Sequence, residues 1–487
     1  MKGISRTILV AILVLILSGC TVGPDYRPPD THPPAKWHSP MHGGLTSEKP
    51  DIQTLARWWT TLGDPLLTSL EERAVKGNLD LKKAIYRVRE ARAMRGMEKA
   101  RFFPYLDARA SAQELRSSAY STEKKSPGAK RRGEESKLYQ VGLDSTWELD
   151  IFGGTRRSVE AAQAQLEATQ EDLRDVLVSL TAEVALNYVD IRTYQARLAA
   201  AKANLKAQER IYQLNLSRYR AGLIDELAVQ QSRYVMENTR SQIPGLEKAL
   251  EKAMNRLAVL LGETPGSLHR ELASVKPIPL PPLKVAVGIP ADTLCQRPDV
   301  RRAERELAAA TANIGVAKAE LYPKLDLSGT IGLESVSSGH LWEWVSRTSG
   351  FGLHIFWQIF HAGALREKVK AQEAREKQAL MSYRQTVLKA LEEVEDALVA
   401  YAKEQQRLES LKEATQAARA AYRIAWDRYR AGLVDFTDVM DAERALQSYQ
   451  DQLAESEGAV ASSLIRIYKA LGGGWSHMEP LIEEKTK

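Results

Sequence analysis

The sequence predicts a mainly helical protein with a small β part, built from two tandem copies of one unit. The segment RYRAGL occurs at residues 218–223 and again, at an offset of 210, at residues 428–433. Each occurrence ends a stretch of more than sixty residues without Gly or Pro, which is typical of a very long helix. Ahead of each stretch the hydrophobic period changes from about 3.6 to 2, which indicates strands.

Residues 1–19 have the features of an export signal. Lys2 and Arg6 precede a run of ten apolar residues, which is too short to span a bilayer. The run ends in Leu-Ser-Gly before Cys20, a pattern that resembles the bacterial lipoprotein cleavage box. We therefore expect Cys20 to carry a covalent lipid such as palmitate and to begin the mature chain; an ordinary signal peptide with an incidental Cys is the alternative. Cys295 is then a free thiol, which we expect to be a small apolar filler.

The repeat divides the mature chain into segments. We expect a lipidated tether over residues 20–50, a first repeat over 51–273, a Pro-rich linker over 274–290, a second repeat over 291–475 and a tail over 476–487. Trp147 and Gly153 in the first copy match Trp357 and Gly363 in the second at the same offset. The composition of the linker predicts a polyproline-like connector.

Each copy contains a helix that extends about 100 Å at 1.5 Å per residue. A column of residues spaced seven apart, mostly apolar, runs from Leu177 to Tyr219 in the first helix and from Val387 to Tyr429 in the second. A period of seven indicates left-handed coiled-coil packing against neighbouring helices. A single helix surrounded by solvent would not keep such a column apolar.

Both long helices are expected to end at the same kind of turn. These turns are Ala221, Gly222 and Leu223 in the first copy and Ala431, Gly432 and Leu433 in the second. Gly suits the left-handed position that ends a helix, and Asp225 or Asp435 is expected to cap the helix that follows. The following helices are expected to reach about Leu261 and Leu471, with Pro244 kinking or breaking the first. Each copy therefore contains a helical hairpin.

Four segments of about ten residues alternate between apolar and polar side chains, at residues 106–113, 139–150, 325–334 and 351–359. This length suits a tilted membrane strand with lipid on one side and water on the other, whereas an amphipathic hairpin on a soluble core is the alternative. Aromatic residues lie in or beside the segments, as in interfacial belts: Tyr139, Trp147, Trp342, Trp344, Phe351 and Trp357. Four strands cannot close a membrane barrel. Two chains would supply eight strands and three would supply twelve, which leaves room for a passage, so a trimer is predicted.

Composition and motifs exclude several classes of protein. The chain has 68 Lys and Arg and 62 Asp and Glu, interleaved along its length, so its net charge of +6 does not indicate nucleic-acid binding. A mean hydropathy of −0.34 excludes a multi-span helical membrane protein. The sequence has no dinucleotide fingerprint, Walker loop, HExxH or paired CxxC, and we expect neither an enzyme nor a cofactor. His32, His38, Met41 and His42 lie in the Pro-rich tether, where no metal site is expected.

Several motifs together resemble the TolC-like outer-membrane efflux lipoproteins (the NodT subgroup) over essentially the whole mature chain. They are CTVGPDY at residues 20–26, WW at 58–59 with GDP at 63–65, IPAD at 289–292 with RPDVR at 297–301, and IGVAK at 314–318. The resemblance implies a homotrimer with a twelve-strand outer-membrane barrel, continued by a helical barrel through the periplasm. It also implies a passive exit channel, which works with a periplasmic adaptor and an inner-membrane pump of the RND type. The alternative is the adaptor lipoprotein of such a system, which would have one hairpin and no pair of β-hairpins.

The resemblance also implies functional residues. Family gates carry two carboxylates just past the second tip, and the matching residues are Asp438 and Asp441, three copies of which would ring a pore and favour cations. Carboxylates that simply stabilise a helix N-terminus are the alternative interpretation. The first copy has Ala228 and Gln231 at these positions, so only one hairpin per chain would contribute. The two Ala-Gly-Leu turns match the adaptor-docking tips of the family, a role that is compatible with ending the helix.

Overall fold

The computed structural model describes residues 21–30, 32–49, 51–118, 135–279 and 284–476. The predicted signal, Cys20 and nearly all of the predicted tail lie outside these residues. The chain divides into two compact units. The first contains the chain up to Pro29 and residues 90–168 and 304–382, and the second contains residues 30–89, 169–303 and everything from 383 onward.

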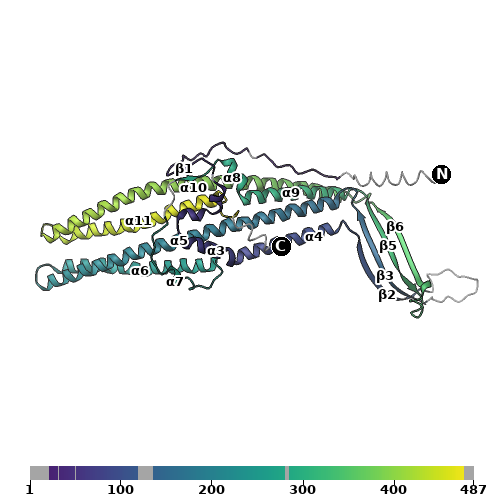
Figure 1. Cartoon of the computed structure of the whole chain (residues 1–487), viewed down its shortest axis with the longest axis horizontal. Coiled ribbons are helices and arrows are strands. Elements are labelled where there is room, and N and C mark those ends of the chain that lie inside the picture. Colours follow the sequence, from purple (N-terminus) through teal and green to yellow (C-terminus); the bar gives the residue numbers. More distant parts are fainter. Residues whose placement is uncertain (1–20, 31, 50, 119–134, 280–283, 477–487) are drawn as a thin grey trace, which may run out of the picture. The chain divides into compact units, whose positions relative to one another are not determined.

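The first unit contains one antiparallel sheet of four strands in the order β2-β3-β5-β6 (Figure 1). The strands are β2 (Tyr105–Arg116), β3 (Glu135–Leu149), β5 (Lys324–Ser335) and β6 (Arg347–Phe356), with the short 3-10 helix η2 (Trp344–Ser346) before β6. All four predicted strands are therefore confirmed. The expected extension of the last strand to residue 359 is wrong, because β6 ends at Phe356. The indole N–H of Trp357 instead donates to the carbonyl of Leu321, at 3.2 Å.

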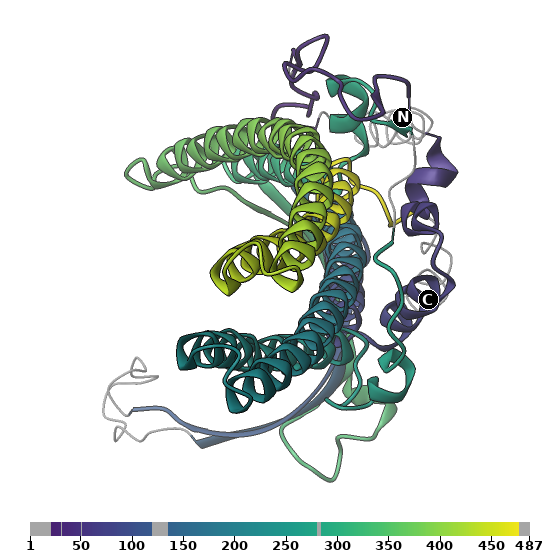
Figure 2. The same cartoon turned by 90° about the vertical axis from the view of Figure 1, so that its left-hand side faces the viewer.

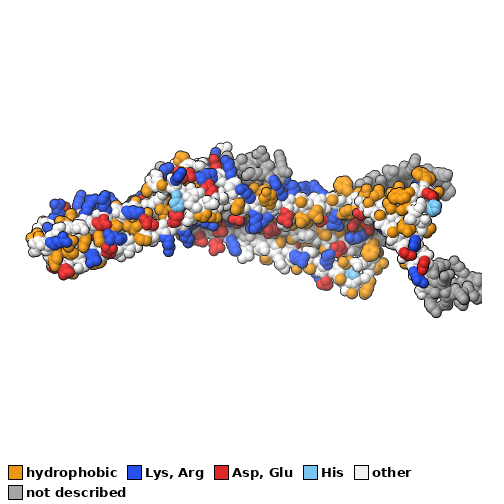
Figure 3. Space-filling view, turned by 90° about the horizontal axis from the view of Figure 1, so that it is seen from below, with side chains coloured by type: hydrophobic (Ala, Val, Ile, Leu, Met, Phe, Trp, Pro, Cys, Tyr) orange, Lys and Arg blue, Asp and Glu red, His pale blue; other side chains and the backbone are white. Residues whose placement is uncertain are grey.

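The pairing register places the apolar side chains of all four strands on one face of the sheet. Leu143 of β3 lies opposite Ala108 of β2 and Ile331 of β5, and the next row pairs Asp144 with Asp107 and Thr330. Because side chains alternate between faces along a strand, one aligned apolar row aligns every second row. Figure 3 shows hydrophobic side chains gathered over the strand region. The sheet therefore has one apolar face that is open in the single chain.

Each copy of the repeat has the same order of helices around its two strands. The helices α4 (Leu79–Ala100) and α9 (Pro298–Ala319) precede the strands, and α5 (Gly154–Arg220) and α10 (Ala364–Arg430) follow them. Each long helix turns into a second helix, α6 (Glu226–Leu260) or α11 (Phe436–Ala470) (Figure 1). Figure 2 shows the hairpins α5–α6 and α10–α11 as two neighbouring pairs. The predicted fold class and the two long helical hairpins are confirmed.

Pro244 does not break the helix that contains it. Helix α6 runs without interruption from Glu226 to Leu260. Pro244 lies on an exposed face of this helix. The carbonyl that loses its helical hydrogen bond there can be hydrated, so the cost of the proline is tolerated. The expectation of a break is therefore wrong.

The core of the second unit follows the seven-residue columns of the long helices. Val184 and Ile191 of α5 and Val394 and Tyr401 of α10 are fully buried, as coiled-coil packing predicts. Short elements pack in the same unit: α2 (Ile52–Ala56), η1 (Trp58–Leu62), α3 (Pro65–Gly77), α7 (His269–Leu272) and α8 (Pro290–Gln296). Trp58 stacks on Tyr468 with a centroid distance of 5.3 Å.

Two expectations change, one about the linker and one about the start of the second repeat. The described part of the linker is not only an extended connector, because β4 (Val285–Ala286) pairs in parallel with β1 (Leu45–Thr46) of the tether. Cys295 is a free thiol, but it is exposed and so is not a buried filler. It lies at the end of α8, on the side that faces away from the core.

None of the described helices combines the length and the apolar character that crossing a membrane requires.

Candidate functional site

The tips of both hairpins are built by the same backbone geometry. Leu223 N–H donates to the carbonyl of Arg218 at 2.9 Å, and Leu433 N–H donates to that of Arg428 at 3.0 Å. These bonds satisfy carbonyls that a helix end leaves free. The Gly between them has a φ of 72° in the first tip and 74° in the second, values that an L side chain rarely adopts. The sequence prediction of where both helices end is confirmed.

Both tips end in an exposed leucine. The side chain of Leu223 is 71% exposed and that of Leu433 is 74% exposed. In this type of helix end the residue after the Gly usually packs back onto the last helical turn. A single exposed Leu means little, but the same exposure at two matched tips leaves an apolar side chain at the end of each hairpin. Stopping the helix accounts for the Gly and not for the exposed Leu.

The predicted gate residues Asp438 and Asp441 lie together on the exposed face of α11. They are three residues apart, and Phe436, Val439 and Met440 form the buried stripe of the same helix. The nearest charge recorded for Asp441 is Arg444, at 3.6 Å, in an ion pair that is largely exposed to solvent. The two carboxylates therefore face away from the core of the chain.

The corresponding residues of the first hairpin are placed differently. Ala228 is buried, and the Gln231 amide reaches Thr437 of α11, with 3.5 Å between Nε2 and Oγ1. Gln231 thus lies beside the residue that precedes Asp438. The structure brings α6 close to the predicted gate carboxylates, and the two matching residues of α6 carry no charge.

An apolar cluster joins the two hairpins next to their tips, and sequence reasoning did not identify it. Its buried members come from all four hairpin helices: Ile211, Ala228, Val235, Tyr429, Phe436, Val439 and Met440. The ring of Tyr429 packs on Phe436 with a centroid distance of 5.3 Å, and its hydroxyl donates to Oδ1 of Asn215 at 3.4 Å. The guanidinium of Arg218 lies 5.5 Å from the same ring. The repeated RYRAGL segments thus contact each other across the two hairpins.

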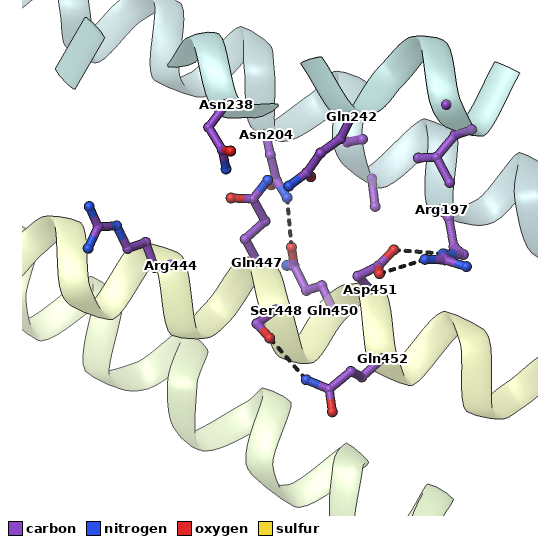
Figure 4. A pocket seen from close by; sticks show the side chains of 14 residues that line it. Arg197, Asn204, Asn238, Gln242, Arg444, Gln447, Ser448, Gln450, Asp451 and Gln452 are labelled. Carbon is purple, nitrogen blue, oxygen red and sulfur yellow. Dashed lines mark hydrogen bonds and ion pairs between the residues drawn. The ribbon is translucent and has the colours of Figure 1, made fainter. Parts of the chain in front are cut away.

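Further from the tips, the contact between hairpins becomes polar. Asp451 of α11 forms a two-point ion pair with Arg197 of α5, at 2.7 and 2.8 Å, and Gln450 accepts a hydrogen bond from Asn204 at 3.2 Å (Figure 4). Gln447 donates to Thr239 of α6 at 2.9 Å. These residues border an open cavity of about 510 Å³ whose walls are rich in amide side chains. Because water can replace such polar contacts, this seam resists separation less than the apolar cluster does.

A buried acid lies within the apolar contact. Glu443 of α11 is 9% exposed, and burial raises the pKa of its carboxyl. Burial also raises the pKa of Tyr422 to about 12, and the nearby Glu443 adds to that rise. The residue at the matching position of the first hairpin is Arg233, which is exposed. Only the second hairpin therefore has an acid buried at this level.

The RPDVR motif, used above only as a sign of resemblance, builds an ion-pair hub. The side chain of Arg297 is 7% exposed and forms a two-point pair with Asp299 at 3.0 and 2.7 Å. It also donates to Glu393 of α10 and to the carbonyl of Ala470 at the end of α11, both at 2.7 Å. One guanidinium thus ties the start of α9 to α10 and α11. These ion pairs and hydrogen bonds stabilise the packing of the three helices.

Three further expectations concern the lipid site, metal binding and the tether. Cys20 lies outside the described residues. In the described parts of the chain no three or more His, Cys, Asp or Glu side chains are grouped so as to hold a metal ion. The backbone N–H of His38 donates to Glu395 at 2.6 Å, so this part of the tether is docked on α10.

Comparison with known proteins decides the family. The family model described as "Outer membrane efflux protein" matches residues 70–263 and 289–473, which together are more than half of the chain. The chain belongs to the outer membrane efflux protein family. The two matched segments reflect the tandem repeat of this efflux protein.

Relatives and solved structures agree with this assignment. Nodulation protein T of Rhizobium leguminosarum bv. trifolii is 34% identical over 468 residues, which cover 95% of this chain and 96% of that protein. The toluene efflux pump outer membrane protein TtgI of Pseudomonas putida is 32% identical over 465 residues, covering 95% and 97%. The outer-membrane channel OprN superposes with a TM-score of 0.86 at 37% identity, covering 94% of this chain and 100% of that one. The open state of the Neisseria gonorrhoeae MtrE outer membrane channel gives 0.81 at 26% identity, covering 94% and 99%.

These findings settle several expectations. The TolC-like resemblance, the outer-membrane location and the function in efflux are confirmed. The family consists of efflux channels and not of enzymes. The adaptor alternative is wrong, because this efflux protein has two long hairpins and two β-hairpins joined in one sheet.

Proposed function

We propose that three copies of this chain form the exit duct of a tripartite efflux system, with a twelve-strand barrel in the outer membrane and a helical barrel in the periplasm. The observation that carries the proposal is the four-stranded sheet. Among the described residues, β2 pairs only with β3 and β6 only with β5, so both edges are open. A sheet with two open edges and an open apolar face is unstable in water and needs partners and lipid. Three such sheets joined edge to edge supply twelve strands.

The side chains around β6 support its insertion in a bilayer. Trp342 and Trp344 before the strand are 74% and 73% exposed, and Phe356 and Trp357 at its other end are 61% and 53% exposed. Ten residues at about 3.4 Å each, tilted by about 40°, span roughly 25 Å along the membrane normal. This equals the height of the apolar band of membrane barrels, which aromatic girdles border on both sides.

The helical hairpins provide the periplasmic functions. We propose that the tips Ala221, Gly222, Leu223, Ala431, Gly432 and Leu433 dock a periplasmic adaptor, whose apolar side chains would cover Leu223 and Leu433. Asp438 and Asp441 form the gate: three copies of each place six carboxylates around the pore, where they attract cations and repel anions. Substrates arrive from an inner-membrane pump, most simply of the RND type, through the adaptor. Opening separates hairpins that are held by one apolar cluster and a polar seam.

The mature protein is anchored by lipid on Cys20 and carries no other cofactor. Two repeats, over residues 51–273 and 291–475, perform no chemical reaction and need no nucleic acid or metal. Burial of the acyl chains in the membrane contributes about 0.8 kcal/mol per methylene group, in addition to the anchoring by the strands.

Planar-bilayer recording on the purified, lipid-bearing protein tests this function. We expect a trimer by chemical cross-linking, ion conduction that rises when the gate carboxylates are removed, and an acyl mass that disappears in Cys20→Ala. A protein that stays monomeric in lipid and never conducts, with or without the gate carboxylates and at any salt concentration, would contradict the proposal. An unchanged mass in Cys20→Ala would refute the lipid alone.

A further inference from the structure

The chain just after the predicted lipid site is docked on the first unit. The N–H of Val22 donates to the carbonyl of Phe152 at 3.1 Å. Thr21 lies directly on Gly153, where a Cβ would come within 2.6 Å of the Thr21 methyl group. Gly153 immediately precedes α5 and lies four residues beyond the last residue of β3. The first described residues of the chain therefore lie at the junction of sheet and helix.

A buried arginine of α5 holds this segment by its backbone. The side chain of Arg157 is 5% exposed, and it donates to the carbonyls of Val22 at 3.2 Å and Gly23 at 3.4 Å. It also pairs with Asp25 and Glu160, each at 2.7 Å. Asp25 is 86% exposed, so water weakens that ion pair, and the two carbonyls provide the specific part of the contact. Loss of the segment would leave a guanidinium that has lost three of its four partners.

Gly23 lets the segment approach α9 closely. A Cβ on Gly23 would lie 2.5 Å from Cα of Gly315, and its φ of 100° also disfavours any L side chain. A Cβ on Gly315 would in turn lie 2.7 Å from the side chain of Arg157. Gly23, Gly315 and Arg157 are thus stacked without space for another atom.

The end of the segment is held by a second set of contacts. The hydroxyl of Tyr26 donates to Glu304 of α9 at 3.1 Å, and the guanidinium of Arg305 lies 5.5 Å from its ring. The ring rests on a surface of small residues, Ala164 of α5 with Ala308 and Ala309 of α9. One short segment therefore bridges a helix of the first repeat and a helix of the second.

We propose that Thr21–Tyr26 is a built-in docking segment that fixes the lipid-bearing residue at the sheet-helix junction. Thr21, the residue that follows the proposed lipid site, is itself held at this junction by its contact with Gly153. The inference rests on the proposed function, in which Cys20 carries acyl chains and the strands enter the outer membrane. The acyl chains then enter the leaflet at the level where the strands begin. A free tether would let the lipid sit anywhere within its reach.

Proteolysis of the full-length lipoprotein in lipid nanodiscs tests the docking. Chymotrypsin cleaves after tyrosine, and cleavage after Tyr26 requires the segment to leave its groove. Gly23→Ala and Arg157→Met each remove one half of the contact, and we expect cleavage after Tyr26 to become at least about tenfold faster. The matched control is Arg197→Met, which removes an arginine pair from the second unit and should leave the rate at Tyr26 unchanged.

Two further measurements keep the test decisive. Gly23→Ala changes no helix, so equal helical circular dichroism with unchanged cleavage in this variant would overturn the proposal even if Arg157→Met fails to fold. A fluorophore on Pro24→Cys in a Cys295→Ser background should be quenched by brominated lipid, and Gly23→Ala should reduce the quenching. Absence of quenching in the background protein would also overturn the proposal. The acyl mass of Cys20, measured separately, shows whether the underlying function has failed instead.

Discussion

The two hairpin tips have the same six residues and the same backbone turn but different surroundings. Tyr219 in the first tip is 42% exposed, whereas Tyr429 in the second is 9% exposed. The difference arises from residues outside the repeated segment. Phe436 packs against the ring of Tyr429, and Asn215 accepts a hydrogen bond from the Tyr429 hydroxyl. The Arg218 side chain of the first tip also contributes to the packing of the second tip, because its guanidinium lies against the ring of Tyr429.

The two copies of the hairpin thus share one turn but differ in the side chains that surround it. Local chemistry ends both helices in the same way, and this requirement explains why the repeat keeps its Gly. The second hairpin carries the two carboxylates proposed as a gate, a buried acid and the buried tyrosine, and the first hairpin provides part of the surface against which the tyrosine packs.

The gate carboxylates should give the largest functional difference. Asp438→Asn combined with Asp441→Asn removes six charges from the proposed trimer, so conductance should rise or cation preference should fall by about threefold or more in bilayer recordings. The matched change in the first hairpin, Gln231→Ala, should leave ion selectivity unchanged. Equal selectivity in the double variant and the parent would remove the gate assignment.

The two tyrosines should differ in their effect on stability. Tyr429→Ala opens a cavity in the cluster and should cost about 3 kcal/mol of local stability, whereas Tyr219→Ala should cost about 0.5 kcal/mol. Hydrogen exchange of the backbone amides next to each tip, in α10 and α11 for Tyr429 and in α5 and α6 for Tyr219, measures the local opening free energy. Similar losses in both variants would show that the two tips are packed alike in solution.

The buried acid should make the second hairpin sensitive to pH. Burial raises the pKa of Glu443 in the folded state, so the folded chain holds this proton more firmly than the unfolded chain. Its stabilising contribution is complete below the unfolded pKa and is lost as pH rises through the folded pKa.

Glu443→Gln should therefore match the parent near pH 4 and become progressively more stable than the parent toward pH 8. Thermal unfolding midpoints across this range provide the measurement. Arg233→Gln, at the matched exposed position, should leave the pH profile of the parent unchanged. If the unfolding midpoints of the parent and of Glu443→Gln changed with pH in the same way, this would contradict the role of the acid.

The helix caps should give the smallest difference. Asp225 accepts a hydrogen bond from the N–H of Ala228 at 3.2 Å, whereas the side chain of Asp435 makes no capping bond, contrary to expectation. Asp225→Ala should cost about 1 kcal/mol in the first turn of α6, and Asp435→Ala should cost almost nothing in α11. Exchange of the first-turn amides in both helices distinguishes the two outcomes.

Much of the fold could be predicted because its signals are local and periodic. Long stretches without Gly or Pro, a Gly at each tip and alternation along four strands set the helices, the turns and the apolar face of the sheet. Two local predictions failed: Pro244 does not break its helix, because it lies on an exposed face, and the last strand ends at Phe356 and not at residue 359.

By itself, then, the sequence determined the tandem repeat, the type and extent of the main elements, and the family. Only the tertiary structure decided which side chains of equal chemistry are buried. Tyr219 and Tyr429 have the same local sequence, and Cys295 is exposed although a thiol suits a core. The docking of Val22 and Gly23 on Arg157 was equally unpredictable. Burial depends on what lies opposite in space, and residues far apart in the chain provide that surface.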